Sequence, residues 1–216
     1  MSNIRFRLAK PSDAKQIAFV HYHIRDKYDQ GFFAMVNYSF LKQYYRIMLN
    51  DPNEVFVCAE NENGTILGFN SGSLDASKQF ATMRKKKWSF VLPLITSSIK
   101  NPGIIKKAFD RFRFTTGESQ NKYITATGVR GEYWGWLSNQ KDTDASVEMH
   151  ERWLAVMKSL GVKDIFFEVD VINKKIYKFH KLNGAKILNT YTLPDGRERS
   201  EMVYELDTYK FKFIKL

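Results

Sequence analysis

Residues 164–185, DIFFEVDVINKKIYKFHKLNGA, carry the pattern on which the fold prediction depends. Residues 164–171 form a nearly continuous apolar run, which is typical of a strand buried within a sheet. A helix is predicted from Asn173 or Lys174 to Asn183, because Gly184 follows at the position where helices commonly end. A buried strand followed by a short helix predicts a sheet that is covered by helices.

Strand and helix patterns continue on both sides of this stretch. The sequence predicts, in order, a strand at 4–9, helices around Ile17 and Tyr44, a hairpin of 55–60 with 65–71, a strand at 132–137, a helix with its apolar stripe from Met149 to Leu160, and a closing hairpin of 186–192 with 200–206. Hairpins mixed with helical crossovers imply a mixed sheet. We therefore expect an α/β fold, with a central mixed sheet flanked by helices, in a single domain over residues 1–216.

Composition and charge narrow the functional classes. The 216 residues include 34 Lys and Arg against 23 Asp and Glu, a net charge of +11 that favours an anionic partner. Cys58 is the single cysteine, which excludes an internal disulfide and a thiolate metal cluster. We see no secretory signal in the first residues and no apolar stretch of the roughly 20 residues that a membrane span needs. A cytoplasmic protein without a transmembrane segment is expected.

Residues 74–130 form a basic insert. Ten Lys or Arg residues between 78 and 114 stand against one acid, Asp110. Apolar residues share two helical faces, so an added pair of helices is expected: Trp88, Val91, Leu92, Ile95 and Ile99 on one, and Ile104, Ile105, Phe109 and Phe112 on the other. The run RKKK at 84–87 is either a solvated helix end or an anion site. As an anion site it suits the phosphates of a nucleotide-linked amino sugar, an acidic bilayer or RNA.

The tail at 207–216 alternates aromatic residues with polar ones. Tyr209, Phe211 and Phe213 recur at every second position, the period of a strand. This pattern predicts either an extra edge strand or a contact between the two copies of a homodimer.

Three separated segments carry a family resemblance: RLAKPSD at 7–13, the hairpin from Val57 to Gly68, and Glu168-Val169 followed by Asn173 and Gly184. In this order and spacing they resemble the GNAT N-acyltransferase superfamily. The resemblance implies acetyl-CoA or another acyl-CoA as co-substrate, no metal, and acyl transfer to a primary amine. The acceptor would be a small molecule, possible examples being a phosphorylated or nucleotide-linked amino sugar.

The cofactor loop departs from the family pattern. The family signature Arg/Gln-x-x-Gly-x-Gly/Ala aligns with residues 141–146, KDTDAS, so both glycines are missing. The cofactor-binding residues that the resemblance implies are Leu137, Ser138, Lys141, Thr143, Ala145, Ser146 and Asn173. Asp144 or Ser146 is equally suited to cap the following helix. A second hypothesis follows, in which cofactor binding is lost and the chain is a non-catalytic binding or regulatory module with a basic surface.

The resemblance also implies three catalytic roles. Glu132, at the start of the strand before the loop, is the predicted base, on the same face as Trp134 and Trp136. His180 stands seven residues after Asn173, where the family usually has the tyrosine that protonates the leaving thiolate, and Tyr177 is the alternative donor. Backbone amides of residues 136–138 would hold the oxyanion. The predicted substrate-binding residues are Trp134, Trp136, Arg84 and Asp170, although each of these also suits a structural role.

Overall fold

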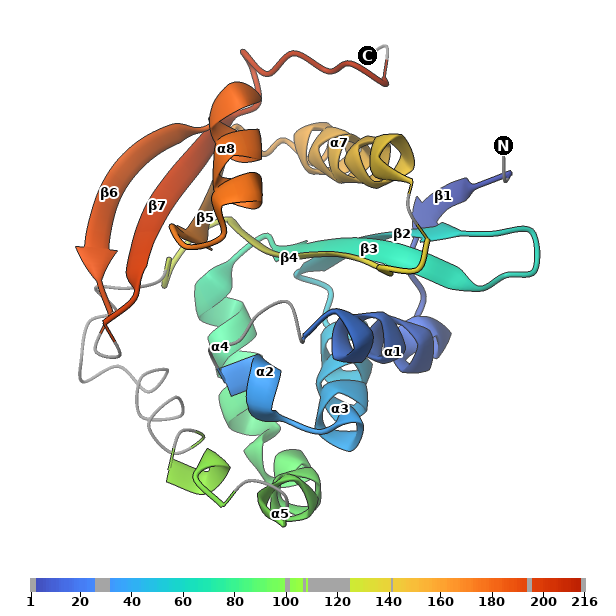
Figure 1. Ribbon diagram of the computed structural model, residues 1–216, viewed down its shortest axis with the longest axis vertical. Coiled ribbons are helices and arrows are strands. Elements are labelled where there is room, and N and C mark those ends of the chain that lie inside the picture. The colour runs from blue at the N-terminus through green and yellow to red at the C-terminus, as the bar shows by residue number, and fades with distance from the viewer. Residues whose placement is uncertain are drawn as a thin grey trace.

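A computed structural model describes residues 3–25, 32–99, 102–106, 108, 125–140, 142–193 and 196–214 of the chain. These residues form a seven-stranded mixed sheet in the order β1-β2-β3-β4-β5-β7-β6 (Figure 1). The strands are β1 (Arg5–Leu8), β2 (Glu54–Glu60), β3 (Ile66–Ser73), β4 (Arg130–Trp136), β5 (Asp164–Asp170), β6 (Lys186–Thr192) and β7 (Glu198–Glu205). Neighbouring strands are antiparallel except for β4 and β5, which are parallel. The predicted mixed α/β sheet is therefore confirmed.

The helices lie on both faces of this sheet. They are α1 (Ala14–Ile24), α2 (Phe32–Met35), α3 (Tyr38–Met48), α4 (Ala76–Lys85), α5 (Val91–Ser98), α7 (Thr143–Ser159) and α8 (Lys174–Leu182), with 3-10 turns η1 (Pro11–Asp13) and η3 (Lys87–Phe90). Figure 1 shows α7 and α8 above the sheet and α1, α3, α4 and α5 below it. Helix α8 begins and ends as predicted, and Gly184 follows it with a φ of 89°, the left-handed region that suits glycine.

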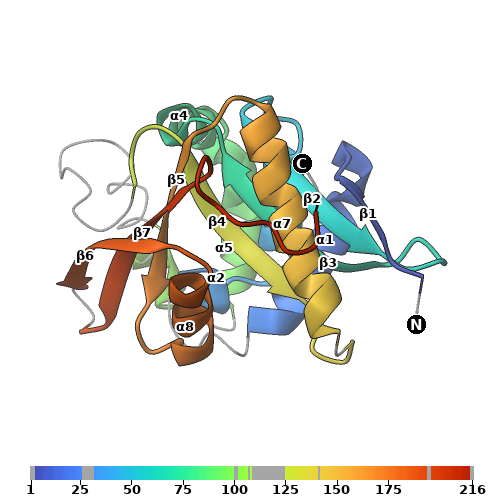
Figure 2. The ribbon, with the colours of Figure 1, turned by 90° about the horizontal axis from the view of Figure 1, so that it is seen from above.

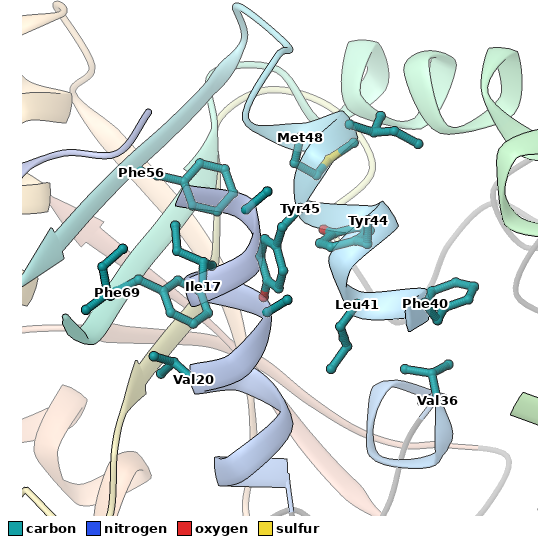
Figure 3. Packing of buried hydrophobic residues seen from close by; sticks show 14 of the residues in the cluster. Ile17, Val20, Val36, Phe40, Leu41, Tyr44, Tyr45, Met48, Phe56 and Phe69 are labelled. Carbon is teal, nitrogen blue, oxygen red and sulfur yellow. The ribbon is translucent and has the colours of Figure 1, made fainter. Parts of the chain in front are cut away.

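Two apolar cores hold the helices to the sheet. Below it, α1 and α3 pack on β2 and β3, and Figure 3 shows Tyr45 reaching from α3 towards Ile17 and Phe69. The rings of Tyr45 and Phe69 lie 5.4 Å apart in an edge-to-face arrangement, which aromatic pairs favour. Above the sheet, Trp153 of α7 is buried and donates its indole N–H to the carbonyl of Val55 in β2, 3.0 Å away.

The strands β4 and β5 separate soon after they begin to pair. Their one point of register in the ladder joins Arg130 to Phe166. Figure 2 shows β4 diverging from β5 past this point, beside α8. Since the described residues supply no other strand there, the outer edge of β4 is left open along the divergence.

The insert and the tail behave differently from each other. Within the insert, η3 and α5 cover the first expected helix, whereas α4 was not expected. Of the second expected helix, residues 104–106 and 108 are helical, and Phe109 and Phe112 lie outside the described residues. Of the two alternatives for the tail, the edge strand is wrong, because residues 207–214 form turns and irregular structure, whereas the homodimer contact stays a prediction. The reason is that the amides of Lys212 and Phe213 donate to the buried Glu151 carboxylate of α7, 2.8 Å away in each case, and not to a strand.

Among the helices of the described residues, none has both the length and the apolar character to span a membrane.

Candidate active site

A cavity of about 660 Å³ lies where β4 and β5 diverge. It reaches both faces of the sheet, since His21 and Phe33 line it from below and His150 and His180 from above. The other lining residues come chiefly from β4, β5 and the start of α8. The opening in the sheet thus creates a cavity lined by residues from both faces.

The open edge of β4 presents backbone groups to this cavity. The Leu137 amide donates to Leu67 of β3 at 2.8 Å, and Gly135 pairs with Phe69. Because hydrogen-bonding direction alternates along an antiparallel pair, the amides of residues 134 and 136 point away from β3. They are available to an extended ligand that binds as an added strand. The predicted oxyanion role for the Leu137 amide is therefore wrong, since this amide is already bonded.

A β-bulge in β4 decides which side chains enter the cavity. Gly72 pairs with Gly131 and Asn70 with Trp134, so Glu132 and Tyr133 together face one residue of β3. An extra residue of this kind reverses the alternation of side chains. The expectation that Glu132 shares a face with the two tryptophans is consequently wrong.

Contacts on the two faces confirm this assignment. Below the sheet, Tyr44 of α3 donates to Glu132 Oε2 at 3.2 Å. Above it, the ring of Trp134 stacks on His150 of α7 with centroids 4.6 Å apart. The bulge therefore brings the predicted base to the α1–α3 side of the opening.

A buried ion cluster surrounds Glu132. Arg130 Nη1 lies 3.2 Å from Glu132 Oε1, and Arg130 Nη2 lies 3.0 Å from Glu168 Oε2. Both carboxylate side chains are only 5% exposed. The Thr125 amide donates to the second oxygen of Glu168, whose pKa is lowered by Arg130 and these hydrogen bonds, against the opposing effect of burial. One guanidinium thus compensates two buried carboxylates.

Glu54 of β2 lies close to this cluster and is neutral at pH 7. Burial raises its pKa to about 9, and the charge of Glu132 contributes in the same direction. Gln79 donates to Glu54 Oε2 at 3.1 Å. With Glu54 protonated, the cluster of Arg130, Glu132 and Glu168 keeps a net charge of −1. A ligand cation would balance this charge.

A second polar cluster lies above the sheet. His180 Nδ1 is 2.8 Å from the Tyr204 hydroxyl, and the Asn70 side-chain amide donates to His150 Nδ1 at 2.9 Å. With Nδ1 accepting, the His150 proton resides on Nε2, which is buried and has no hydrogen-bond partner among the described residues. His150 lines the cavity, but its spare neutral donor is itself buried.

Burial changes what His180 can do. It lowers the pKa of His180 to about 3, so the imidazole is neutral at pH 7 and its cationic, acidic form is scarcely populated. Tyr177, the alternative donor, is partly buried, and the ammonium of Lys181 lies 5.7 Å from the centroid of its ring. His180 and Ile176 of α8 line the cavity, as does Asn173, the N-cap residue of this helix. Tyr177 is not among the lining residues.

The start of α7 is capped by its own carboxylate. Asp142 Oδ1 accepts from the Ala145 amide at 2.9 Å, so Asp142 is the cap. The expectation that Asp144 or Ser146 caps the helix is wrong. The Ser146 hydroxyl accepts from the indole N–H of Trp134 at 3.1 Å. Among the predicted cofactor residues here, Thr143 is exposed, Ala145 is buried, and Lys141 lies outside the described residues.

The remaining predicted residues divide between the cavity and other places. Asn173 and Trp134 line the cavity, as does Asp170, which is held by Arg197 and by Arg199 Nε at 2.6 Å. Leu137 is buried, Ser138 is exposed, Trp136 donates to the Gln140 carbonyl at 2.5 Å, and Arg84 lies in the last turn of α4. None of these four is among the residues that line the cavity.

Several residues of the site were not predicted from sequence. Arg130 could have been found, because a charged residue inside a strand needs a partner. Glu132 lies two residues further along the same strand, and Glu168 lies on the neighbouring strand. Tyr44, Glu54 and His150 gave no such signal, since each was hidden in an apolar helix stripe or strand.

Comparisons with known proteins place the fold. No protein-family model and no curated protein sequence matches the chain. Solved structures do match. The protein yncA from Salmonella typhimurium, solved with its cofactor acetyl-CoA, has a TM-score of 0.57 and 14% identity, over 98% of this chain and 98% of that one. An N-acetyltransferase from Staphylococcus aureus has a TM-score of 0.59 and 12% identity, over 95% and 99%.

The acetyltransferase of the GNAT family from Streptococcus pneumoniae aligns with a TM-score of 0.56 and 11% identity, over 94% of this chain and 99% of that one. Agreement over nearly the whole length, at identities this low, is agreement of architecture, and activity has to be argued from the site. The chain has the fold of the GNAT-family acetyltransferases.

Proposed function

We propose that this protein is an N-acetyltransferase that uses acetyl-CoA, or another acyl-CoA, to acylate a primary amine of a small acceptor. The single observation that carries the proposal is the buried cluster of Arg130, Glu132 and Glu168 at the opening in the sheet. Its net charge of −1, on carboxylates whose side chains are only 5% exposed, favours an ammonium group as the ligand that restores neutrality.

Glu132 is the proposed general base. An amine arrives as an ammonium with a pKa near 10 and has to lose a proton before it can attack a thioester. Glu132 accepts this proton, directly or through one water, while Arg130 and the Tyr44 hydroxyl hold the carboxylate in place at 3.2 Å each. The carboxylate lines the cavity, which gives an acceptor access to it.

The opening also suits the amide-bearing arm of an acyl-CoA. The amides of residues 134 and 136, which point away from β3, would hold carbonyl groups of that arm. Bound acyl-CoA would supply the activated acyl group and a thiolate leaving group. The neutral imidazole of His180 is suited to stabilise the departing thiolate by hydrogen bonding, and not as a cationic acid.

The diphosphate is the part of acyl-CoA for which the fit is weakest. Helix N-termini bind anions through free backbone amides, but here Asp142 occupies the Ala145 amide and Asp144 adds a second carboxylate in the first turn. This observation favours the alternative hypothesis, in which the chain is a binding or regulatory module that uses its basic surface. Binding of acetyl-CoA separates the two hypotheses.

Changing Asp142 to asparagine tests where the diphosphate binds. Asparagine caps a helix about as well as aspartate, so the substitution removes the charge and keeps the cap. We expect acetyl-CoA to bind about fivefold more tightly, which corresponds to roughly 1 kcal/mol for one charge at a helix terminus. Calorimetric titration measures the change, and Asp164→Asn, an exposed carboxylate at the start of β5, is the control. Equal affinities in all three proteins would place the phosphates away from α7.

The acceptor that we propose is an amine that also carries a phosphate group, such as an amino sugar phosphate or a nucleotide-linked amino sugar. Six basic and three acidic side chains line the cavity among the described residues, and five of the basic ones lie outside the cluster of Arg130, Glu132 and Glu168. These five are Arg25, Lys174, Lys175, Arg197 and Arg199. A cavity lined both by the carboxylates of the buried cluster and by these basic side chains matches a zwitterionic acceptor.

Reversing the charge of Lys174 and Lys175 tests this acceptor class. Both lysines are exposed in the first turn of α8 and line the cavity. We expect the double change to glutamate to raise KM for an amino sugar phosphate about tenfold or more and to leave KM for the unphosphorylated amino sugar nearly unchanged. Thiol release measures both rates. Lys178→Glu, an exposed lysine of α8 that does not line the cavity, is the control, and equal effects on both acceptors would contradict the proposal.

A further inference from the structure

We propose that the outer face of η3 and α5 docks on the surface of an anionic lipid bilayer. This surface, which we call the docking face, consists of Trp88, Val91, Leu92, Ile95 and Ile99. The proposal is independent of the acetyl-transfer chemistry, because none of these residues lines the cavity.

The docking face is an apolar stripe without a partner in the described structure. Trp88 is 76% exposed, Leu92 70% and Ile99 80%, and Val91 and Ile95 are exposed as well. The spacing of three, four, seven and eleven residues from Trp88 places all five on one side of a helix. Single exposed apolar residues are ordinary, but a contiguous stripe of this size marks an interaction surface.

The opposite face of the same segment is fixed to the rest of the protein by hydrogen bonds and ring packing. Ser97 is buried and its hydroxyl accepts from the Asn37 amide at 3.2 Å, while the Asn37 side chain donates to Thr96 at 3.0 Å. The ring of Phe90 packs on Phe40 of α3, with centroids 5.0 Å apart. Because the inner face is fixed in this way, the docking face points away from the protein. Figure 1 shows α5 at the extremity of the molecule, away from the sheet.

Charge selects the partner. Lys85 and Lys86 are exposed immediately before the stripe, and the Lys87 ammonium lies 5.2 Å from the centroid of the Trp88 ring. Asp75 is the one acid among the described residues from 74 to 106. Basic residues beside an apolar helical face, with a tryptophan at the boundary, match the negative headgroups and shallow apolar layer of an anionic bilayer. A symmetric dimer through this face would instead bring like charges of two copies together.

Vesicle binding by the full chain tests the proposal. The protein is mixed with vesicles of equal parts phosphatidylcholine and phosphatidylglycerol, and separately with vesicles of phosphatidylcholine alone. We expect cosedimentation with the anionic vesicles only, a loss of binding as salt is raised, and a blue shift of tryptophan emission that is absent in Trp88→Phe. Leu92→Gln and the double change of Lys85 and Lys86 to glutamate should each reduce the partition coefficient about tenfold or more.

Matched variants separate this face from the net charge of the whole chain. Leu182→Gln alters a comparably exposed leucine of α8, and the double change of Lys163 and Lys210 to glutamate makes the same charge reversal elsewhere; both should bind vesicles like the wild type. No binding to anionic vesicles would overturn the proposal, as would an equal loss in the control variants. It would also be overturned if Leu92→Gln dissociated a dimer, measured by light scattering, or abolished binding to an RNA oligomer while vesicle binding was absent.

Discussion

Replacing Glu132 with glutamine is expected to lower kcat/KM for acyl transfer by a factor of about 10²–10⁴, the usual contribution of a general base. Glutamine keeps the size of the side chain and its contact with Tyr44 but cannot take a proton from the acceptor amine. Thiol release from acetyl-CoA, with an amino sugar phosphate as acceptor, measures the change. The affinity for acetyl-CoA should remain within about twofold of the wild type, because Glu132 contacts the acceptor side of the opening.

Two further variants show whether the loss is chemical. Tyr44→Phe removes the hydrogen bond to Glu132 Oε2 and keeps the carboxylate, so a loss of only about tenfold is expected. Glu201→Gln changes a partly buried carboxylate of β7 that does not line the cavity and should leave the rate unchanged. If Glu132→Gln kept most of its activity at alkaline pH, the loss at neutral pH would be that of a base. Full activity at neutral pH would assign the base to another group.

Stability should fall steeply when the pH is lowered from about 6.5 to about 5. Burial lowers the pKa of His21 to about 3 and that of His180 to about 3, and it lowers the pKa of His150 well below its ordinary value. The unfolded chain binds a proton at each histidine near pH 6.5, whereas the folded protein does not. Each histidine therefore costs about 2 kcal/mol of unfolding free energy over this interval.

Glu54 opposes part of this loss. Its pKa is raised to about 9 in the folded state, so its stabilising contribution is complete below the unfolded pKa and is lost as the pH rises towards 9. Acidification from 6.5 to 5 recovers about 2 kcal/mol at Glu54, which leaves a net loss of about 4 kcal/mol from the four groups together. This is a large part of the 5–15 kcal/mol that holds a typical domain.

Urea unfolding at the two pH values measures the loss. In the wild type the Tyr45 hydroxyl lies 2.5 Å from His21 Nδ1. His21→Gln removes one titrating group and retains a hydrogen-bond partner for this hydroxyl. The difference in unfolding free energy between the two pH values should shrink by about 2 kcal/mol in this variant. His23→Gln, an exposed histidine of the same helix, should keep the full difference. An unchanged difference in His21→Gln would show that other groups drive the acid transition.

The fold was predictable where local patterns and tertiary structure agree. The apolar run at 164–171 and the helix ended by Gly184 gave β5 and α8, and the Asn-Gly turn gave the β2–β3 hairpin. The edge strand in the tail was mispredicted because Tyr209 and Phe211 alternate like a strand, while the contact that positions the tail is a carboxylate of α7.

The site was predictable only in part, because the bulge in β4 has no sequence signature. Alternation assigns Glu132 to the face of Trp134, and a single extra residue opposite Ser71 transfers it to the opposite face. The pKa of His180 depends on Trp134, Phe167 and Tyr204, which approach it from three other elements. Burial by segments distant in sequence is not contained in the local pattern around a residue.

Calorimetric titration of the protein with acetyl-CoA, followed by thiol release after an amine is added, tests the central claim most directly. Free adenosine bisphosphate and desulfo-CoA are the ligand controls, and Lys141→Glu changes the cation that the family resemblance places at the diphosphate. We predict saturable binding of acetyl-CoA that the charge reversal weakens, and acceptor-dependent release of thiol that Glu132→Gln slows by a factor of about 10²–10⁴. Absence of binding at millimolar acetyl-CoA would contradict the enzymatic account and favour a binding or regulatory module with the same fold.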